Sequence, residues 1–78
     1  MNDLVAERIE INPDVKLGKP VVWGTRIPVE LILQKMSEGA TEADLLDAHP
    51  RLTKEDIKAA LAYAARSLAH ETILLYGD

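Results

Sequence analysis

The chain has 78 residues, which is the size of a single domain. It contains no cysteine, so it can form neither a disulfide framework nor a cysteine-based metal site. A net charge of −4 is unfavourable for contact with nucleic-acid phosphates. We see no apolar run of membrane-spanning length and no secretory signal in the sequence. We therefore expect one cytoplasmic domain over residues 1–78, with no membrane contact.

The apolar residues are small. Hydrophobic residues make up 47% of the chain, but there is no Phe and only one Trp. Domains below about 80 residues are marginally stable unless they are stapled or paired. We therefore expect a core of Ile, Leu, Val and Ala that recruits a partner, and we expect a homodimer.

The first part of the chain predicts short strands. Residues 8–11 alternate between polar and apolar side chains, and residues 20–23 form a second short apolar run. Gly24 interrupts this run, and residues 25–27 resume an extended pattern. This pattern predicts a small β-ribbon within a β segment at residues 8–28.

Three helices are predicted after this segment. Pro28 suits the first helical position, because its missing N–H would be unpaired there, and Gly39 suits the end of the same helix. The first helix therefore covers about residues 28–38. Thr41 with Asp44, and Thr53 with Asp56, repeat a capping-box pattern that begins a helix. These pairs predict a short helix at residues 42–48 and a long one from residue 54 to about residue 75.

The long helix has two candidate faces. Apolar residues at helical spacing predict its core stripe, and alanines on the opposite side form a strip of small residues that suits close helix packing. The stripe consists of Ile57, Leu61, Ala64 and Leu68, and the strip of Ala59, Ala62 and Ala69.

A short and a long helix joined by a tight turn, with another helix before them, indicate a helix-turn-helix domain. The predicted fold class is thus mainly α. We expect a three-helix bundle over residues 28–76 with a small N-terminal β-ribbon.

Catalytic and metal-binding patterns are missing from the sequence. His49 and His70 lack the spacing of a metal pair, and Gly18-Lys19 lacks the rest of a phosphate-binding loop. The acidic residues at 38, 42, 44 and 47 lie at a helix end and on an outer helix face, where acids are ordinary. We therefore expect no enzyme activity, no catalytic residue, no metal site and no cofactor.

Two binding surfaces are open candidates. The start of the long helix presents Arg51, Thr53, Lys54 and Lys58 as candidate nucleic-acid contacts. Acidic residues lie among them, and the alternative is an ordinary solvent-exposed face with mixed charge. The end of the same helix is apolar most of the way round and predicts a protein partner, unless it folds back on its own domain. This apolar end consists of Ile73, Leu74, Leu75 and Tyr76.

The stretch from Ile11 to Ala65 closely resembles the domain-of-unknown-function 433 family. The resemblance rests on a Gly-Lys-Pro block, a Gly-Thr-Arg-Ile-Pro-Val block, a His-Pro turn and a Leu-Thr pair before the last helix. The marks in the first two blocks are Gly18, Lys19, Pro20, Gly24, Thr25, Arg26 and Pro28.

The resemblance implies a homeodomain-like helix-turn-helix protein with an N-terminal β segment. It also implies an antitoxin related to the VapB type, paired with a PIN-like ribonuclease toxin. Together with the basic start of the long helix, it leads us to expect operator DNA as a further ligand. We expect the two blocks to be a scaffold rather than a ligand site: the glycines turn the ribbon, Pro28 begins the first helix, Thr25 ties the turn to the backbone, and Arg26 pairs with an acid. The rival reading is an interaction module that never contacts DNA.

Overall fold

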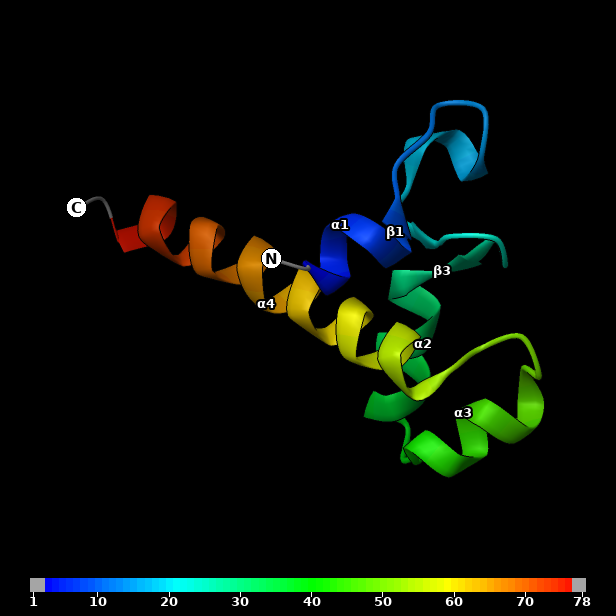
Figure 1. Cartoon of the computed structure of the whole chain (residues 1–78). Coiled ribbons are helices and arrows are strands. Elements are labelled where there is room, and N and C mark those ends of the chain that lie inside the picture. The colour runs from blue at the N-terminus through cyan, green and yellow to red at the C-terminus, as the bar shows by residue number, and fades with distance from the viewer. Residues whose placement is uncertain (1–2, 77–78) are drawn as a thin grey trace.

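In the computed structural model, the described residues form four α-helices and a small three-stranded sheet that lies to one side of them (Figure 1). The structure describes residues 3–76, and the side chains of residues 3–69. Among the described residues, no helix is both long enough and apolar enough to cross a membrane. The four helices and the three short strands confirm the prediction of a mainly helical domain with a small β segment. The elements are α1 Leu4–Arg8, β1 Ile9–Glu10, the 3-10 turn η1 Lys16–Gly18, β2 Val21–Val22, β3 Ile27–Pro28, α2 Val29–Ser37, α3 Glu42–Ala48 and α4 Lys54–Tyr76.

The sheet is an antiparallel meander with strand order β1-β2-β3. Val22 of the central strand pairs with Ile9 on one side and with Ile27 on the other. Val21 and Val22 are both fully buried, so the central strand is covered on both faces. This explains why the strand is a run of valines rather than an alternating pattern.

The core joins the sheet to α2, α3 and α4. Ile32 of α2 and Ile57 of α4 are among the largest fully buried side chains. Buried aliphatic residues of the sheet and the helices belong to one cluster. Because strands of two residues are not stable alone, the sheet depends on the helices that pack against it. The main cluster consists of Val22, Val29, Ile32, Leu45, Leu52, Ile57 and Ala60.

The boundaries of α2 differ slightly from the prediction. Pro28 is the N-cap of α2 rather than its first helical residue, and it also belongs to β3. Pairing with Val21 holds Pro28 in the extended conformation, so the helix begins at Val29. At the other end Gly39 adopts a φ of +106°, which a residue with a side chain rarely adopts, and the chain then turns into α3.

Both predicted capping boxes are present. The Asp44 N–H donates to Thr41 Oγ1 over 3.1 Å, and the Thr41 N–H donates back to Asp44 Oδ2 over 2.9 Å. Thr53 and Asp56 form the same reciprocal pair at the start of α4, with distances of 3.1 and 3.0 Å. These contacts satisfy N–H groups that a helix leaves unpaired, and α3 covers the predicted range.

The sequence did not predict α1. This helix packs against α4, next to Ala59, which is fully buried. Asp3 caps α1 and also receives two hydrogen bonds from Arg66, both of 3.2 Å. Arg8 contacts Asp56 and Asp3 contacts Arg66, so α1 lies along the face of α4 that carries Ala59. At Ala59 the predicted strip of small residues is therefore covered by a helix of the same chain rather than by a partner.

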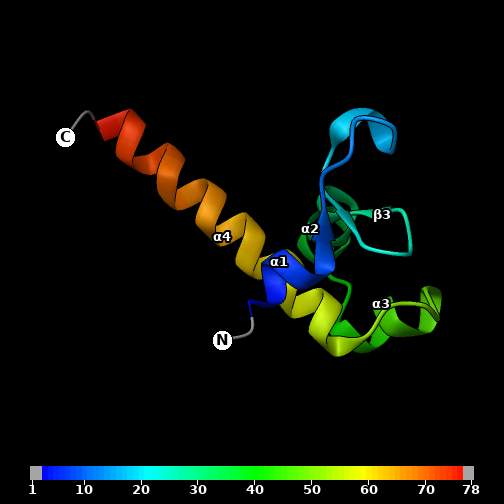
Figure 2. The ribbon, with the colours of Figure 1, turned by 45° about the horizontal axis from the view of Figure 1, so that its top comes forward.

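The prediction of a core stripe along the whole of α4 is partly wrong. Ile57 is buried, but Leu61 is 41% exposed and Leu68 is 60% exposed. The second half of α4 projects away from the other elements in both views (Figures 1 and 2), and the molecule extends 42 Å along its longest axis. Apolar spacing predicts a stripe over the whole helix, whereas the domain covers only its first half.

Candidate functional site

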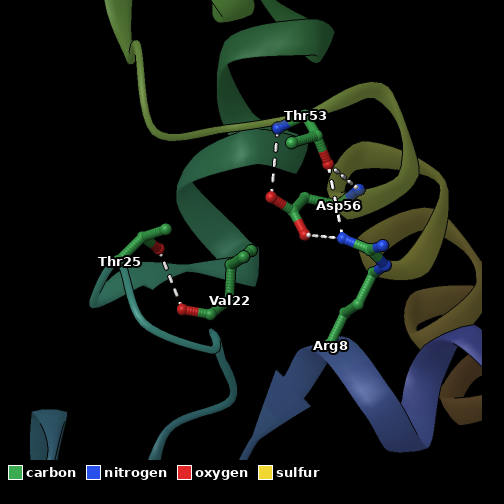
Figure 3. A network of polar contacts seen from close by, with 5 residues as sticks. All are labelled: Arg8, Val22, Thr25, Thr53 and Asp56. Carbon is green, nitrogen blue, oxygen red and sulfur yellow. Dashed lines mark hydrogen bonds and ion pairs between the residues drawn. The ribbon is translucent and has the colours of Figure 1, made fainter.

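The β2–β3 turn, residues 23–26, is a rigid four-residue structure. The Thr25 hydroxyl donates to the Val22 carbonyl over 2.8 Å (Figure 3). It also accepts from the Ile27 N–H over 3.0 Å. Gly24 and Arg26 adopt φ values of +81° and +60°. The expected role of Thr25 in tying the turn to the backbone is confirmed. Arg26 is exposed and forms no ion pair with any described side chain, so the expected pairing is not seen there.

This turn lies against the connection between α3 and α4. Arg51 Nη1 donates to the Gly24 carbonyl over 3.4 Å, which is long for a hydrogen bond. Arg51 is exposed, and the structure shows no carboxylate partner for it among the described side chains. Tertiary structure thus brings the Gly-Thr-Arg block to the His-Pro turn, about 27 positions further along the chain.

The predicted nucleic-acid residues at the start of α4 have different surroundings. Thr53 Oγ1 accepts from the Asp56 N–H and lies 3.5 Å from Arg8 Nη1, so its hydroxyl serves the helix cap. Lys54 and Lys58 are exposed, one turn apart, and neither forms an ion pair with a described side chain. Two cations of the predicted set therefore present a free charged face on α4.

A buried carboxylate connects α1 to the start of α4. Asp56 Oδ1 lies 3.0 Å from Arg8 Nη1, and Asp56 Oδ2 accepts from the Thr53 N–H (Figure 3). The Asp56 side chain is nearly buried, and that of Arg8 is about one-third exposed. Each carboxylate oxygen of Asp56 therefore has a hydrogen-bond partner, and Asp56 and Arg8 together carry no net charge.

Two clefts flank the contact between Arg51 and Gly24. The first has a volume of about 480 Å³ and lies between α1, the β2–β3 turn and the start of α4. The second, of about 440 Å³, lies between the same turn and the end of α3. Thr25 and Arg51 line both clefts. The first is lined by Glu7, Arg8, Trp23, Gly24, Thr25, Arg51 and Asp56, and the second by Thr25, Ile27, Ala48, His49, Pro50 and Arg51.

The Gly-Lys-Pro block lies at the other end of the sheet. Gly18 has a φ of +84°, and the two residues before it, Lys16 and Leu17, also adopt left-handed conformations. Lys19 Nζ pairs with Glu30 of α2 over 2.8 Å, and the Pro20 carbonyl accepts from the Val29 N–H. This block therefore joins the β1–β2 loop to the start of α2 and is remote from the first cleft.

An apolar groove of about 250 Å³ runs between α2 and α4. Its walls include Leu33, Tyr63 and Leu68. The predicted partner residues follow along α4, where the structure describes the backbone as helical but not the side chains. The placement of Ile73, Leu74, Leu75 and Tyr76 thus lies outside the described side chains.

One carboxyl group has a clear shift. The hydrogen bonds from Arg66 hold the pKa of Asp3 below its ordinary value, and the backbone N–H of Val5 acts in the same direction. Among the described residues, no group of three or more His, Cys, Asp and Glu side chains is placed to hold a metal.

Sequence reasoning missed the first cleft because its walls come from three separate segments. Trp23 was visible as the chain's one tryptophan, and at 67% exposure it is unusual for so large an apolar side chain. Glu7 and Arg8 belong to the helix that was not predicted. Nothing in their local sequence places them beside Arg51.

The fold and the clefts define a small helical domain whose three-stranded sheet presents one turn beside the start of its longest helix. The chain belongs to the family described as "Protein of unknown function (DUF433)", which matches residues 9–64. It is 34% identical over 80 residues to "Uncharacterized protein y4eO" of Sinorhizobium fredii. That alignment covers the whole of this chain and 36% of the relative, so the chain spans about a third of that protein.

A solved structure has the same fold. The crystal structure of a DUF433 member protein from Anabaena variabilis matches with a TM-score of 0.76 and 35% sequence identity. The match covers 81% of this chain and 62% of the other. The arrangement of sheet and helices is thus shared between the two proteins.

Proposed function

We propose that the chain is an antitoxin-type regulator that holds a partner protein along the projecting half of α4. The observation that carries this proposal is that α4 continues well beyond the elements that cover its first half, leaving Leu68 exposed. Isolated helical segments of this length are marginal in water, so a covering partner would stabilise the segment. The antitoxin role that the DUF433 resemblance implies favours a PIN-like ribonuclease toxin as that partner, with both proteins in the cytoplasm.

We also propose that α3 and α4 act as a homeodomain-like helix-turn-helix unit on operator DNA. Lys54 and Lys58 support this, because they are exposed, lack described acidic partners and lie at the start of the second helix of the unit. A homodimer would bring two such starts to one duplex and offset the net charge of −4. The protein would then repress its own operon while it neutralises the toxin.

A direct binding experiment tests the DNA half. The double variant Lys54→Glu, Lys58→Glu would be compared with wild type on a duplex carrying the chain's own upstream region, over a series of salt concentrations. We expect weaker binding and a smaller salt slope. Lys16→Glu with Lys35→Glu is the matched control, since it changes the net charge equally at remote exposed positions. Equal losses in both double variants would contradict a specific contact at α4.

The toxin half is tested by co-purification from the native host at physiological salt. A ribonuclease that co-purifies and loses activity when the purified chain is added would support the proposal. Substitution of Leu68 by Glu should then release the ribonuclease, because a charge would enter the exposed apolar surface of α4. Recovery of the chain alone would contradict the proposal.

A second function is an interaction module without DNA contact. The acidic α2–α3 region favours it, because residues 29–50 carry a net charge of −4. Binding that is equal on operator and random duplexes and disappears at physiological salt would support this alternative.

A further inference from the structure

The first cleft presents three chemical groups that its own structure leaves free. Trp23 exposes two-thirds of its surface on the β2–β3 turn. Arg51 donates only one long hydrogen bond to protein, although a guanidinium has five N–H donors. Glu7, on α1, is exposed and forms no ion pair with a described side chain.

Asp56 and Thr25, which also line the cleft, already have hydrogen-bond partners. Asp56 uses one oxygen for Arg8 and the other for the Thr53 N–H. The Thr25 hydroxyl is held by Val22 and Ile27. At the floor of the cleft a ligand meets the Asp56–Arg8 ion pair, in which Arg8 is about one-third exposed and keeps N–H donors beyond Nη1. The side chains that lack any such partner among the described residues are Trp23, Arg51 and Glu7.

The support of these three groups is rigid. The backbone N–H of Trp23 donates to the Arg8 carbonyl over 2.7 Å, so this hydrogen bond joins the turn to the segment that carries Glu7. Arg51 contacts the same turn through the Gly24 carbonyl, and its exposed guanidinium can turn toward a ligand. The open volume of about 480 Å³ lies in the range of small-ligand sites, and a site held in this way needs little reorganisation on binding.

The three groups match the parts of a nucleotide. An exposed indole offers a stacking face for a base, and a guanidinium pairs with phosphate through two parallel hydrogen bonds. A carboxylate accepts hydrogen bonds from the exocyclic amine of a base. We propose that this cleft binds one unstacked nucleotide, with the base on Trp23, the phosphate on Arg51 and the exocyclic amine on Glu7.

The composition of the cleft weighs against an acidic peptide. Such a peptide would pair with Arg51 but would be repelled by Glu7 and would leave the stacking face of Trp23 unused. A nucleotide uses all three groups, and adenine or cytosine is favoured over thymine, which has no exocyclic amine. The nucleotide can come from a single strand or from a free nucleotide pool, because both present the same base and phosphate.

The chain carries its own reporter for this test, since Trp23 is its only tryptophan. Short single-stranded deoxyadenosine and thymidine oligonucleotides and free AMP would each be titrated while the indole fluorescence is recorded. We expect saturable quenching by the deoxyadenosine strand, with an affinity about tenfold higher than for the thymidine strand. A strand that binds more tightly than AMP identifies a nucleic-acid ligand, and the reverse order identifies a free nucleotide.

Three variants assign the contacts. Arg51→Gln should lower the affinity about tenfold, and Glu7→Gln should reduce the preference for deoxyadenosine over thymidine. Trp23→Ala, followed by anisotropy of a labelled strand, should lose binding, whereas Trp23→Phe should retain part of it. All three side chains are exposed, so the variants should fold. Lys16→Gln is the control, because Lys16 is an exposed cation outside the cleft that forms no ion pair with a described side chain.

The proposal is independent of the proposed binding of duplex DNA by α4. It is overturned if neither strand nor AMP quenches Trp23, or if Arg51→Gln loses no more affinity than the control Lys16→Gln. If a duplex binds through Lys54 and Lys58 while Arg51→Gln leaves the affinity for the single strand and for AMP unchanged, the nucleotide site is also overturned. The proposed binding of duplex DNA by α4 would then be retained.

Discussion

Arg8 of α1 and Asp56 of α4 lie 48 positions apart in the sequence and form an ion pair with an Nη1–Oδ1 distance of 3.0 Å. The same carboxylate completes the capping box of α4 through the Thr53 N–H. One buried side chain thus fixes where α4 begins and where α1 docks. The contact also shapes the floor of the cleft beside Trp23.

Asp56→Ala should lower the free energy of unfolding by about 2–3 kcal/mol, because it removes a helix cap and leaves Arg8 without its partner. Asp44→Ala is the matched control: it breaks an identical capping box that is exposed and has no arginine, and it should cost about 1 kcal/mol. Urea denaturation measures both. Equal losses would mean that the contact with Arg8 adds nothing to stability.

Ala59→Leu should displace α1, because Ala59 is fully buried where α1 packs on α4. Overpacking of this kind costs about 1–3 kcal/mol. Ala65→Leu places the same side chain on an exposed part of the same helix and should change stability by less than about 0.5 kcal/mol. Thermal unfolding with circular dichroism compares the two. Full stability of Ala59→Leu would contradict the packing of α1 described above.

Leu17→Asn should leave stability unchanged or raise it by up to about 1 kcal/mol. Leu17 has a φ of +58° and is 94% exposed, so it carries backbone strain without burying its side chain. Asn tolerates this conformation better than Leu does. Leu17→Ala is the control, since alanine keeps the strain and should bring a smaller gain. Denaturant midpoints would contradict the argument if both variants lost stability equally.

The contribution of the Asp3–Arg66 contact to the stability of the folded chain should decrease at acid pH. Arg66 lowers the pKa of Asp3 in the folded chain, so the charged form stabilises the folded state. This contribution is present above about pH 4, the ordinary pKa of the group, and is lost as the pH falls through the lower folded value. NMR titration of Asp3 should show the lowered pKa in wild type and a return toward the ordinary value in Arg66→Gln. An unchanged titration in the variant would show that Arg66 is not the cause.

The local signals in the sequence were sufficient for most elements. Two Thr-x-x-Asp pairs placed the starts of α3 and α4, because a capping box is made by side chains three residues apart. Gly24, Gly39 and Pro28 marked the turns, since their backbone preferences are intrinsic. These features depend on neighbouring residues alone, so they can be read directly from the order of amino acids.

The tertiary structure decided what covers each face. Local pattern could not show that α1 covers Ala59, nor that the domain ends halfway along α4 and leaves Leu68 exposed. It also could not show that Trp23, Arg51 and Glu7 share one cleft, because residues from three segments meet there only after the sheet packs on α4. Periodicity along the chain specifies which side chains prefer burial, but burial itself is supplied by distant segments. The sequence by itself therefore determined α2, α3, α4, the turns and the caps, whereas long-range packing decided where α1 docks and which surfaces are left for the proposed binding.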